Sequence, residues 1–225
     1  MSRRPDVALP RAAGRPRRRY AARLPVPVRR EQLLDAALEL VGEGGFDAVR
    51  MQAVARRAGV TRPVVYECFG GREELLAALI TRETGRLRAV YAEVALLGDG
   101  EGPKGARRLP VRALATVLDA VAGAPATWRL LYVAPDTVAD GPRQELATAR
   151  AELTEVIRAR FTLYAAALGL PADLDTEVAV PLLRAMVDVA AQRVLLDPER
   201  YPPRRLTAAL HGVLGALSPP LDRPH

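Results

Sequence analysis

Two short apolar segments that meet at a glycine constrain this chain more than any other feature of its sequence. The stretch AVARRAGVTRPVVYECFGGREELL, residues 53–76, carries Val54 before Gly59, and Val60 and Val65 after it. Glycine permits a sharp turn between two helices, and such a pair can hold its second helix in the major groove of DNA. Many helical proteins contain similar corners. The stretch therefore predicts a helical fold first, and a DNA-reading element second.

The composition favours helices along the rest of the chain. Of the 225 residues, 49% are hydrophobic, which is ample for a packed core, and only 4% are aromatic. A low aromatic content together with abundant alanine, leucine and arginine favours helices over strands. We therefore expect an all-α protein of about nine helices.

Apolar periodicity and the breaks at proline and glycine give the expected helices. In the first half these are residues 28–42, 51–58, 62–68 and 72–97, and in the second half 109–122, 125–134, 142–168, 173–196 and 203–217. Thr61 is a good N-cap residue for the third helix, and Pro63 is tolerated in its first turn. Pro181 falls inside the expected 173–196 helix and should kink or split it.

The basic charge is concentrated at the N-terminus. Residues 1–30 contain ten arginines and a single acid, Asp6, whereas the whole chain has a net charge of +7. Such an arm suits a polyanion, because each neutralised phosphate releases condensed counterions. The alternatives are a solvated, disordered tail and, less favoured because Ser2 is the only serine there, a transit peptide.

Cysteine usage and hydropathy point to a soluble intracellular protein. The single cysteine, Cys68, excludes an intrachain disulfide and fits a reducing compartment. No apolar run approaches the ~18 residues that would span a bilayer, so no membrane association is expected. We expect Cys68 to be buried and inert, with a redox sensor as the alternative.

Residues 45–76 resemble the DNA-binding part of the TetR/AcrR family of bacterial transcriptional regulators. The resemblance covers roughly a fifth of the chain and rests on Gly45-Phe46, the turn Ala55…Ala58-Gly59-Val60-Thr61, Tyr66, Phe69 and the run Arg72-Glu73-Glu74-Leu75. The sequence departs from the family pattern at three places, since it has Val49 and Arg50 where threonines are usual, Cys68 in place of histidine, and Arg72 in place of lysine.

The resemblance implies a two-domain organisation and a function. It implies a basic, disordered arm at residues 1–27, a three-helix helix-turn-helix domain at 28–75, a ligand-binding and dimerisation domain at 76–218, and a tail at 219–225. The implied protein is a cytoplasmic, ligand-responsive homodimer that binds a palindromic double-stranded DNA operator, most often as a repressor. An unidentified small-molecule effector would shift the 72–97 helix and change the separation of the two reading heads.

The same resemblance assigns DNA contacts position by position. Thr61, Tyr66 and Arg72 would contact the DNA backbone, Arg62 would read a guanine, and Val64 would touch a thymine methyl. The remaining candidates are Gln52 for a phosphate or base edge, Arg50 for a phosphate, Pro63 for shape, and Arg17, Arg18 and Arg19 for a minor groove. The alternative for each is an ordinary solvated surface position.

The second half offers candidates for a ligand pocket and a dimer interface. Large or polar side chains among aliphatic ones suggest the pocket: Trp128, Tyr132, Phe161, Tyr164, Arg184 and Asp188. The apolar stripe of the last helix, with small residues beside it, suggests pairing with the 173–196 segment of a second subunit: Leu206, Ala209, Leu210, Val213 and Leu217. An intrachain helix pair would show the same spacing.

The sequence gives less support to two other classes of protein. An enzyme is not favoured, because the sequence has no G-x-S-x-G elbow, P-loop, H-E-x-x-H motif or dinucleotide fingerprint, and no catalytic residues or cofactor are expected. A metal site is not expected either, since His211 and His225 lack partners at ligand spacing. A helical scaffold whose basic arm binds acidic partners remains the alternative function.

Overall fold

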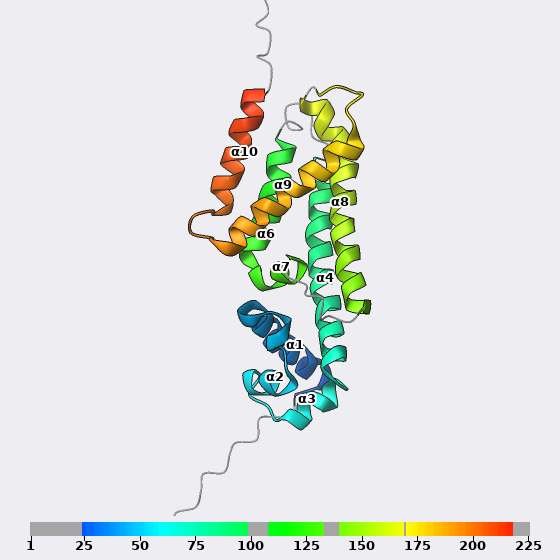
Figure 1. The fold of residues 1–225 in the computed structure, drawn as a ribbon, viewed down its shortest axis with the longest axis vertical. Coiled ribbons are helices and arrows are strands. Elements are labelled where there is room, and N and C mark those ends of the chain that lie inside the picture. The colour runs from blue at the N-terminus through cyan, green and yellow to red at the C-terminus, as the bar shows by residue number, and fades with distance from the viewer. Residues whose placement is uncertain (1–23, 99–107, 133–139, 169, 218–225) are drawn as a thin grey trace, which may run out of the picture.

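All of the described secondary structure is helical, which confirms the expected all-α class. The computed structural model describes residues 24–98, 108–132, 140–168 and 170–217, with the side chains of 162–164, 166–168 and 214–217 left aside. The elements are α1 Val26–Gly44, the 3-10 turn η1 Phe46–Ala48, α2 Met51–Arg57, α3 Arg62–Cys68, α4 Arg72–Leu96, α6 Leu109–Gly123, α7 Pro125–Tyr132, α8 Asp140–Leu168, α9 Thr176–Leu196 and α10 Pro203–Leu217. Figure 1 shows α4 and α8 side by side along much of the molecule.

Most helix boundaries lie within two residues of expectation, and the largest difference is at α9, which begins at Thr176 rather than at residue 173. Helix α1 begins at Val26 rather than at residue 28, because Pro27 lies in the first turn, where its missing N–H costs nothing. The turn η1 was not anticipated. Helix α9 continues through Pro181, so of the two expected outcomes, a kink or a split, the split is wrong. Pro181 lies in the second turn and is exposed, so the helix loses a single backbone bond near its N-terminus.

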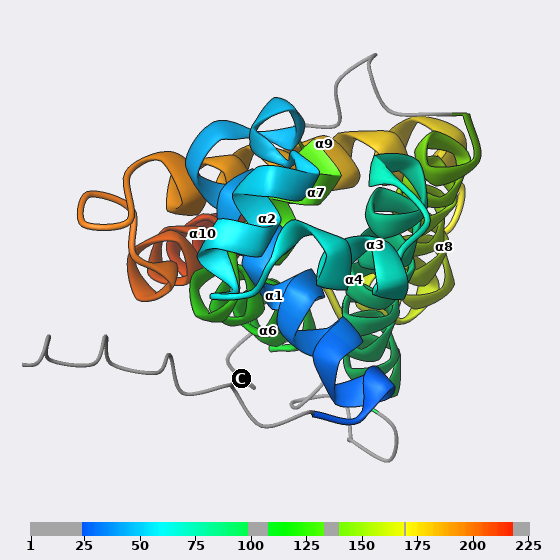
Figure 2. The same ribbon diagram turned by 90° about the horizontal axis from the view of Figure 1, so that it is seen from below.

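Buried side chains form two cores. The first combines α1, η1, α2, α3 and the start of α4, and the second combines the remainder of α4 with α6, α7, α8 and α9. As Figures 1 and 2 show, α1, α2 and α3 lie together at one end of the molecule. Helix α4 contributes to both cores, from Leu75 in the first to Val94 in the second.

Helix α7 lies between the two cores and takes part in each. Leu130 is buried in the first core, whereas Trp128 and Leu131 are buried in the second. The Arg129 guanidinium donates to the carbonyl of Gly42 in α1 at 3.3 Å and to that of Leu195 in α9 at 3.4 Å. A short helix thus joins the end of α1 to the body of the second half.

None of the described helices, taken singly, has the length and apolarity needed to cross a membrane. Helices α6 and α7 satisfy that test only as a pair, and they are bent by 105° relative to each other.

Candidate nucleic-acid interface

The turn between α2 and α3 depends on Gly59. Its φ of 68° is in the left-handed region, which side chains other than glycine rarely adopt. The N–H of Gly59 donates to the Arg56 carbonyl at 3.3 Å, and the N–H of Val60 donates to the Ala55 carbonyl at 2.9 Å. These bonds close the turn and hold α3 across α2.

The packing of α3 leaves one face of this helix outside the core. Val65 and Cys68 are buried, whereas Thr61, Arg62, Pro63 and Tyr66 are exposed and Val64 is half-buried. Thr61 is the N-cap residue by backbone conformation, but its hydroxyl makes no capping bond. The structure therefore brings the predicted α3 residues together on one surface, with Val64 at its edge.

Arg62 and Tyr66 are already paired on this face. They are four residues apart on the helix, and the Arg62 Nη2 donates to the Tyr66 hydroxyl at 3.1 Å. The Arg62 guanidinium also lies 5.3 Å from the centre of the Tyr66 ring. Such a contact limits the rotamers of a long side chain before any partner binds.

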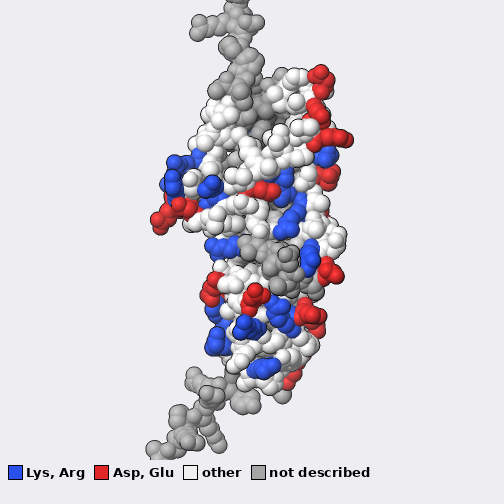
Figure 3. Space-filling model, viewed as in Figure 1, with Lys and Arg blue, Asp and Glu red and all other residues white. Residues whose placement is uncertain are grey.

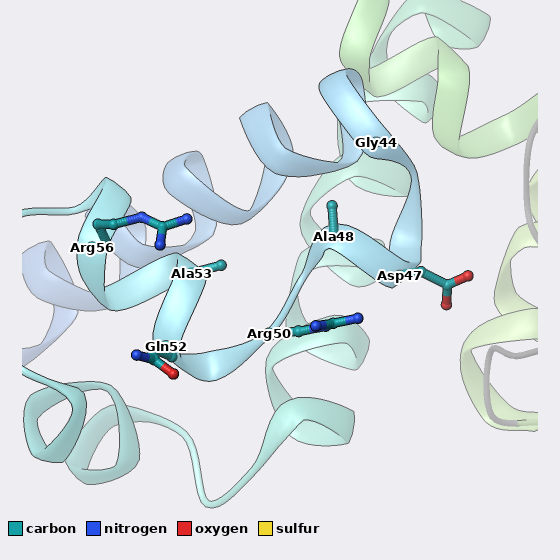
Figure 4. A pocket seen from close by; sticks show the side chains of 7 residues that line it. All are labelled: Gly44, Asp47, Ala48, Arg50, Gln52, Ala53 and Arg56. Atoms are coloured by element: carbon teal, nitrogen blue, oxygen red, sulfur yellow. The ribbon is translucent and has the colours of Figure 1, made fainter.

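A second exposed surface begins at the N-terminus of α2. Arg50, Gln52 and Arg56 line a pocket of about 560 Å³, together with Gly44, Asp47, Ala48 and Ala53. Figure 4 shows these side chains along η1 and α2. Arg56 was not among the sequence candidates. Its position one turn after Gln52, on the same helix face, is the signal that could have identified it.

Arg72 is placed differently from the other candidates. It is half-buried, its Nε donates to the Val49 carbonyl at 2.8 Å, and its Nη2 donates to the Phe46 carbonyl at 2.8 Å. Both acceptors lie beside η1, so Arg72 ties the start of α4 to this turn. This geometry favours a structural role, and contact with DNA phosphate stays a prediction.

Other arginines at this end also bond within the protein. Arg57 donates to Glu39 at 3.0 Å and to Glu43 at 2.6 Å, and its hydrogen bond lowers the pKa of Glu43 below the ordinary value. Arg30 donates to the carbonyl of Cys68, whose thiol is buried. Figure 3 accordingly shows acidic and basic side chains interspersed over this end. The predicted contacts of Arg17, Arg18 and Arg19 lie outside the described residues.

The structure brings three of the six ligand candidates together. The Tyr132 hydroxyl donates to Asp188 at 3.0 Å, and Arg184 Nε donates to the same carboxylate oxygen at 2.8 Å. Trp128 is 1% exposed and Phe161 is buried. The side chain of Tyr164 lies outside the described set.

The dimer candidates divide into two groups. Leu206 and Leu210 are partly buried against the second core, as the alternative of an intrachain helix pair anticipated. Ala209 and Val213 are exposed, and the side chain of Leu217 lies outside the description. Sequence reasoning pointed to residues 173–196 without naming the large exposed side chains of α9, which are Val178, Leu182, Met186, Val189 and Leu196.

Comparison with known proteins places these features in a family. The family model described as bacterial regulatory proteins, tetR family, matches residues 33–79. The HTH-type transcriptional regulator BetI of Rhizobium meliloti is 47% identical over 62 residues, which are 28% of this chain and 30% of BetI. The HTH-type transcriptional repressor KstR of Mycolicibacterium smegmatis is 40% identical over 70 residues, 31% of this chain and 34% of KstR. The similarity thus spans about a third of the length of these curated relatives.

Two solved structures resemble the chain over most of its length. A TetR-like transcriptional regulator from Rhodococcus sp. RHA1 is 27% identical with a TM-score of 0.62, and the match covers 86% of this chain and 100% of that one. The regulator FadR from Bacillus subtilis, solved in complex with stearoyl-CoA, is 17% identical with a TM-score of 0.62, covering 85% and 98%. The second likeness concerns the fold alone.

Proposed function

Because the chain belongs to the TetR family of bacterial regulatory proteins, we propose that it is a ligand-responsive, sequence-specific DNA-binding regulator. Repression, released by a small molecule, is the proposed output. The observation that carries the proposal is the exposed face of α3. Thr61, Arg62 and Tyr66 are exposed on it and follow the turn at Gly59 in the chain. A helix held in this way can enter a major groove and present its side chains to base edges.

The surface of α2 extends the proposed interface. Arg50 and Arg56 flank Gln52 on exposed positions, and their positive charges suit phosphates on either side of a groove. Arg62 is the proposed base-reading residue, because a guanidinium can donate two hydrogen bonds to guanine. The N-terminal arm would add contacts that depend on salt concentration.

A homodimer on a palindromic operator is part of the proposal. Val178, Leu182, Met186 and Val189 lie at spacings of three and four residues on α9, so they share one face, and each is more than 40% exposed. An apolar stripe of this kind is costly to leave in water and suits pairing with its own copy. Ala209 and Val213 on α10 are the proposed additional contacts, in place of Leu206 and Leu210.

The route from effector to DNA is proposed to run through α4 and α7. The buried Glu83 carboxylate in α4 accepts from Thr127 in α7 at 2.6 Å and from Arg82 at 2.7 Å. Arg82 in turn donates to Glu31 and Asp35 in α1, at 3.0 and 2.8 Å. A displacement in the second half therefore has polar and apolar paths to α1. Since FadR, which has the same fold, was solved with stearoyl-CoA, this architecture can accommodate a long apolar effector.

Two competing functions have less support. The family consists of transcriptional regulators, and we propose that this member likewise has no enzymatic activity. We also propose that it works in the bacterial cytoplasm, where its DNA target lies. In the parts of the chain that the structure describes, no three His, Cys, Asp or Glu side chains are grouped as a metal site requires. A scaffold that binds acidic partners through its arm would not need the exposed Arg62–Tyr66 pair.

The test is selection of bound duplexes from a random DNA pool at near-physiological salt. The full-length protein should enrich a two-fold symmetric motif, and a variant lacking residues 1–27 should enrich the same motif with lower affinity. Enrichment of no motif, or binding that disappears entirely with the arm, would contradict the helix-turn-helix function and leave only a basic tail that binds polyanions.

A further inference from the structure

One buried polar group of the second core has no hydrogen-bond partner among the described residues. Tyr91 in α4 is 3% exposed, and its hydroxyl oxygen makes no hydrogen bond within the described structure. Its ring packs edge-on against Trp128, with centroids 6.4 Å apart. An unpaired buried hydroxyl costs about 1–3 kcal/mol, so native proteins rarely retain one without a use.

The surroundings of Tyr91 are polar on one side. The charged groups that act on its hydroxyl are Arg184, Glu152, Asp188 and Arg150, which come from α8 and α9. Arg184 donates to Asp188 at 2.8 Å and to the Arg150 carbonyl at 2.6 Å, and its side chain is only 11% exposed. Helices α4, α8 and α9 thus meet around one polar cluster beside the second core.

The charged groups of this cluster already have hydrogen-bond partners within the chain. Asp188 is neutralised by Arg184, Glu152 is paired with Arg88 at 2.8 Å, and Arg150 donates to the Leu131 carbonyl. Two guanidinium groups and two carboxylates act on the hydroxyl, so a ligand ion of either sign would find no net opposite charge to offset its desolvation penalty. An uncharged oxygen acceptor avoids this penalty.

The hydroxyl is suited to donate. Burial raises the pKa of Tyr91 to about 12, so the group keeps its proton throughout the physiological range. The rest of the neighbourhood is apolar, since Leu87, Val94 and Trp128 belong to the same core. A ligand that reached this donor would therefore be in contact mainly with hydrocarbon.

We propose that the Tyr91 hydroxyl is the donor that binds the uncharged carbonyl oxygen, of ketone, ester or thioester type, of a predominantly apolar effector. The proposal rests on the ligand-responsive function proposed above and specifies the chemical class of its ligand. Tyr132, whose hydroxyl is already bonded to Asp188, provides a matched comparison, because its removal breaks an existing bond.

The first experiment compares Tyr91→Phe and Tyr132→Phe without ligand. Tyr91→Phe should leave the melting temperature unchanged or raise it, because it removes an unpaired group, whereas Tyr132→Phe should lower it. A clear drop in melting temperature for Tyr91→Phe would mean that a water or another group already satisfies the hydroxyl, and it would overturn the proposal.

The second experiment measures binding of 2-decanone, decanoate and decylammonium by calorimetry. The ketone should bind the natural chain more tightly than either ion, and Tyr91→Phe should weaken it about 5-fold or more, as expected for one buried hydrogen bond. Equal ketone affinity in both chains, or tighter binding of an ion, would overturn the proposal. DNA selection is measured separately, so a chain that binds an operator but fails this test refutes only the ligand class.

Discussion

At the scale of single residues, the arginines of α2, α3 and α4 differ in what their guanidinium groups contact. Arg57 is bonded to Glu39 and Glu43 in α1, and Arg72 is bonded to carbonyls beside η1. Arg62, in contrast, is exposed, and among the described residues its guanidinium bonds to Tyr66 in its own helix. The sequence shows equal positive charges at these positions, but only the fold determines which of them remain available to DNA.

Arg62→Ala should weaken operator binding by about 10-fold or more, since a bidentate contact to guanine contributes roughly 1–3 kcal/mol of discrimination. It should also relax the base preference at one position of each half-site. Fluorescence anisotropy with the selected duplex and its single-base variants would measure both effects. Arg57→Ala is the matched control, because it removes the same charge from an arginine that is bonded to α1. Equal losses for the two variants would indicate a general charge effect.

Arg72→Ala should lower the stability of the folded protein. It removes the donor of the Val49 carbonyl and one of the two donors of the Phe46 carbonyl, which should lower the free energy of unfolding by about 1–3 kcal/mol. Arg72→Lys should recover part of this loss, since one ammonium cannot reproduce both bonds. Urea unfolding monitored by circular dichroism checks the stability. If stability were unchanged while operator affinity fell, Arg72 would be a phosphate contact after all.

At the scale of elements, the turn between α2 and α3 depends on a backbone conformation. Gly59→Ala should destabilise the protein by about 1–2 kcal/mol, because φ of 68° is unfavourable for alanine although no atom lies within 4 Å of an added Cβ. Gly85→Ala is the control, because Gly85 lies inside α4, where alanine is the better helix former and nothing obstructs its methyl group. Thermal unfolding should show opposite shifts for the two variants.

Most elements could be predicted from periodicity and from glycine and proline breaks. The bounds of α3 agree with expectation, and α6 and α8 agree within two residues, because their apolar faces and stop signals coincide. The split that was one of the two outcomes expected at Pro181 does not occur, since proline near a helix start removes only one bond and Asp175 caps this start by accepting from two backbone N–H groups. The turn η1 could not be foreseen, because Arg72, 26 residues after Phe46, supplies one of its contacts.

The candidate site was predictable where one helix defines it, and less so where several helices meet. Val65 and Cys68, three residues apart, define the buried face of α3, and Arg62 and Tyr66, four residues apart, share a neighbouring face that stays exposed. The direction of Arg72 depends on η1, and the isolation of the Tyr91 hydroxyl depends on side chains from α8 and α9. Such tertiary contacts leave no local signal in the sequence.

Leu130→Ala tests whether α7 supports the packing of α1, α2 and α3. Leu130 is fully buried in the first core although it follows α4 and α6 in the chain, so its truncation should cost about 2–5 kcal/mol. The cavity would adjoin α1, and operator affinity should fall even though Leu130 lies inside the protein. Leu131→Ala, which opens the second core instead, is the matched variant. Calorimetric unfolding and DNA titration of both variants would separate stability from recognition.

At the scale of the whole molecule, the exposed stripe of α9 is the surface that most needs a partner. Leu182→Glu places a charge within this stripe, where Leu182 is 65% exposed, and should convert the proposed dimer into monomers. Light scattering coupled to size-exclusion chromatography measures the molar mass. Leu96→Glu, at an equally exposed leucine at the end of α4, should leave the mass unchanged. A Leu182→Glu protein that stays dimeric would place the interface elsewhere.

Leu130 of α7 and Leu146 of α8 complete the core that α1, α2 and α3 begin. The end of the molecule that carries the proposed DNA-binding surface is therefore not a unit that can be exchanged freely. A chimera that joins this N-terminal segment to the second half of a relative would bring unmatched side chains into its core. Successful recombination between such regulators, in the laboratory or in evolution, would have to transfer the first 80 or so residues together with the positions of α7 and α8 that they enclose.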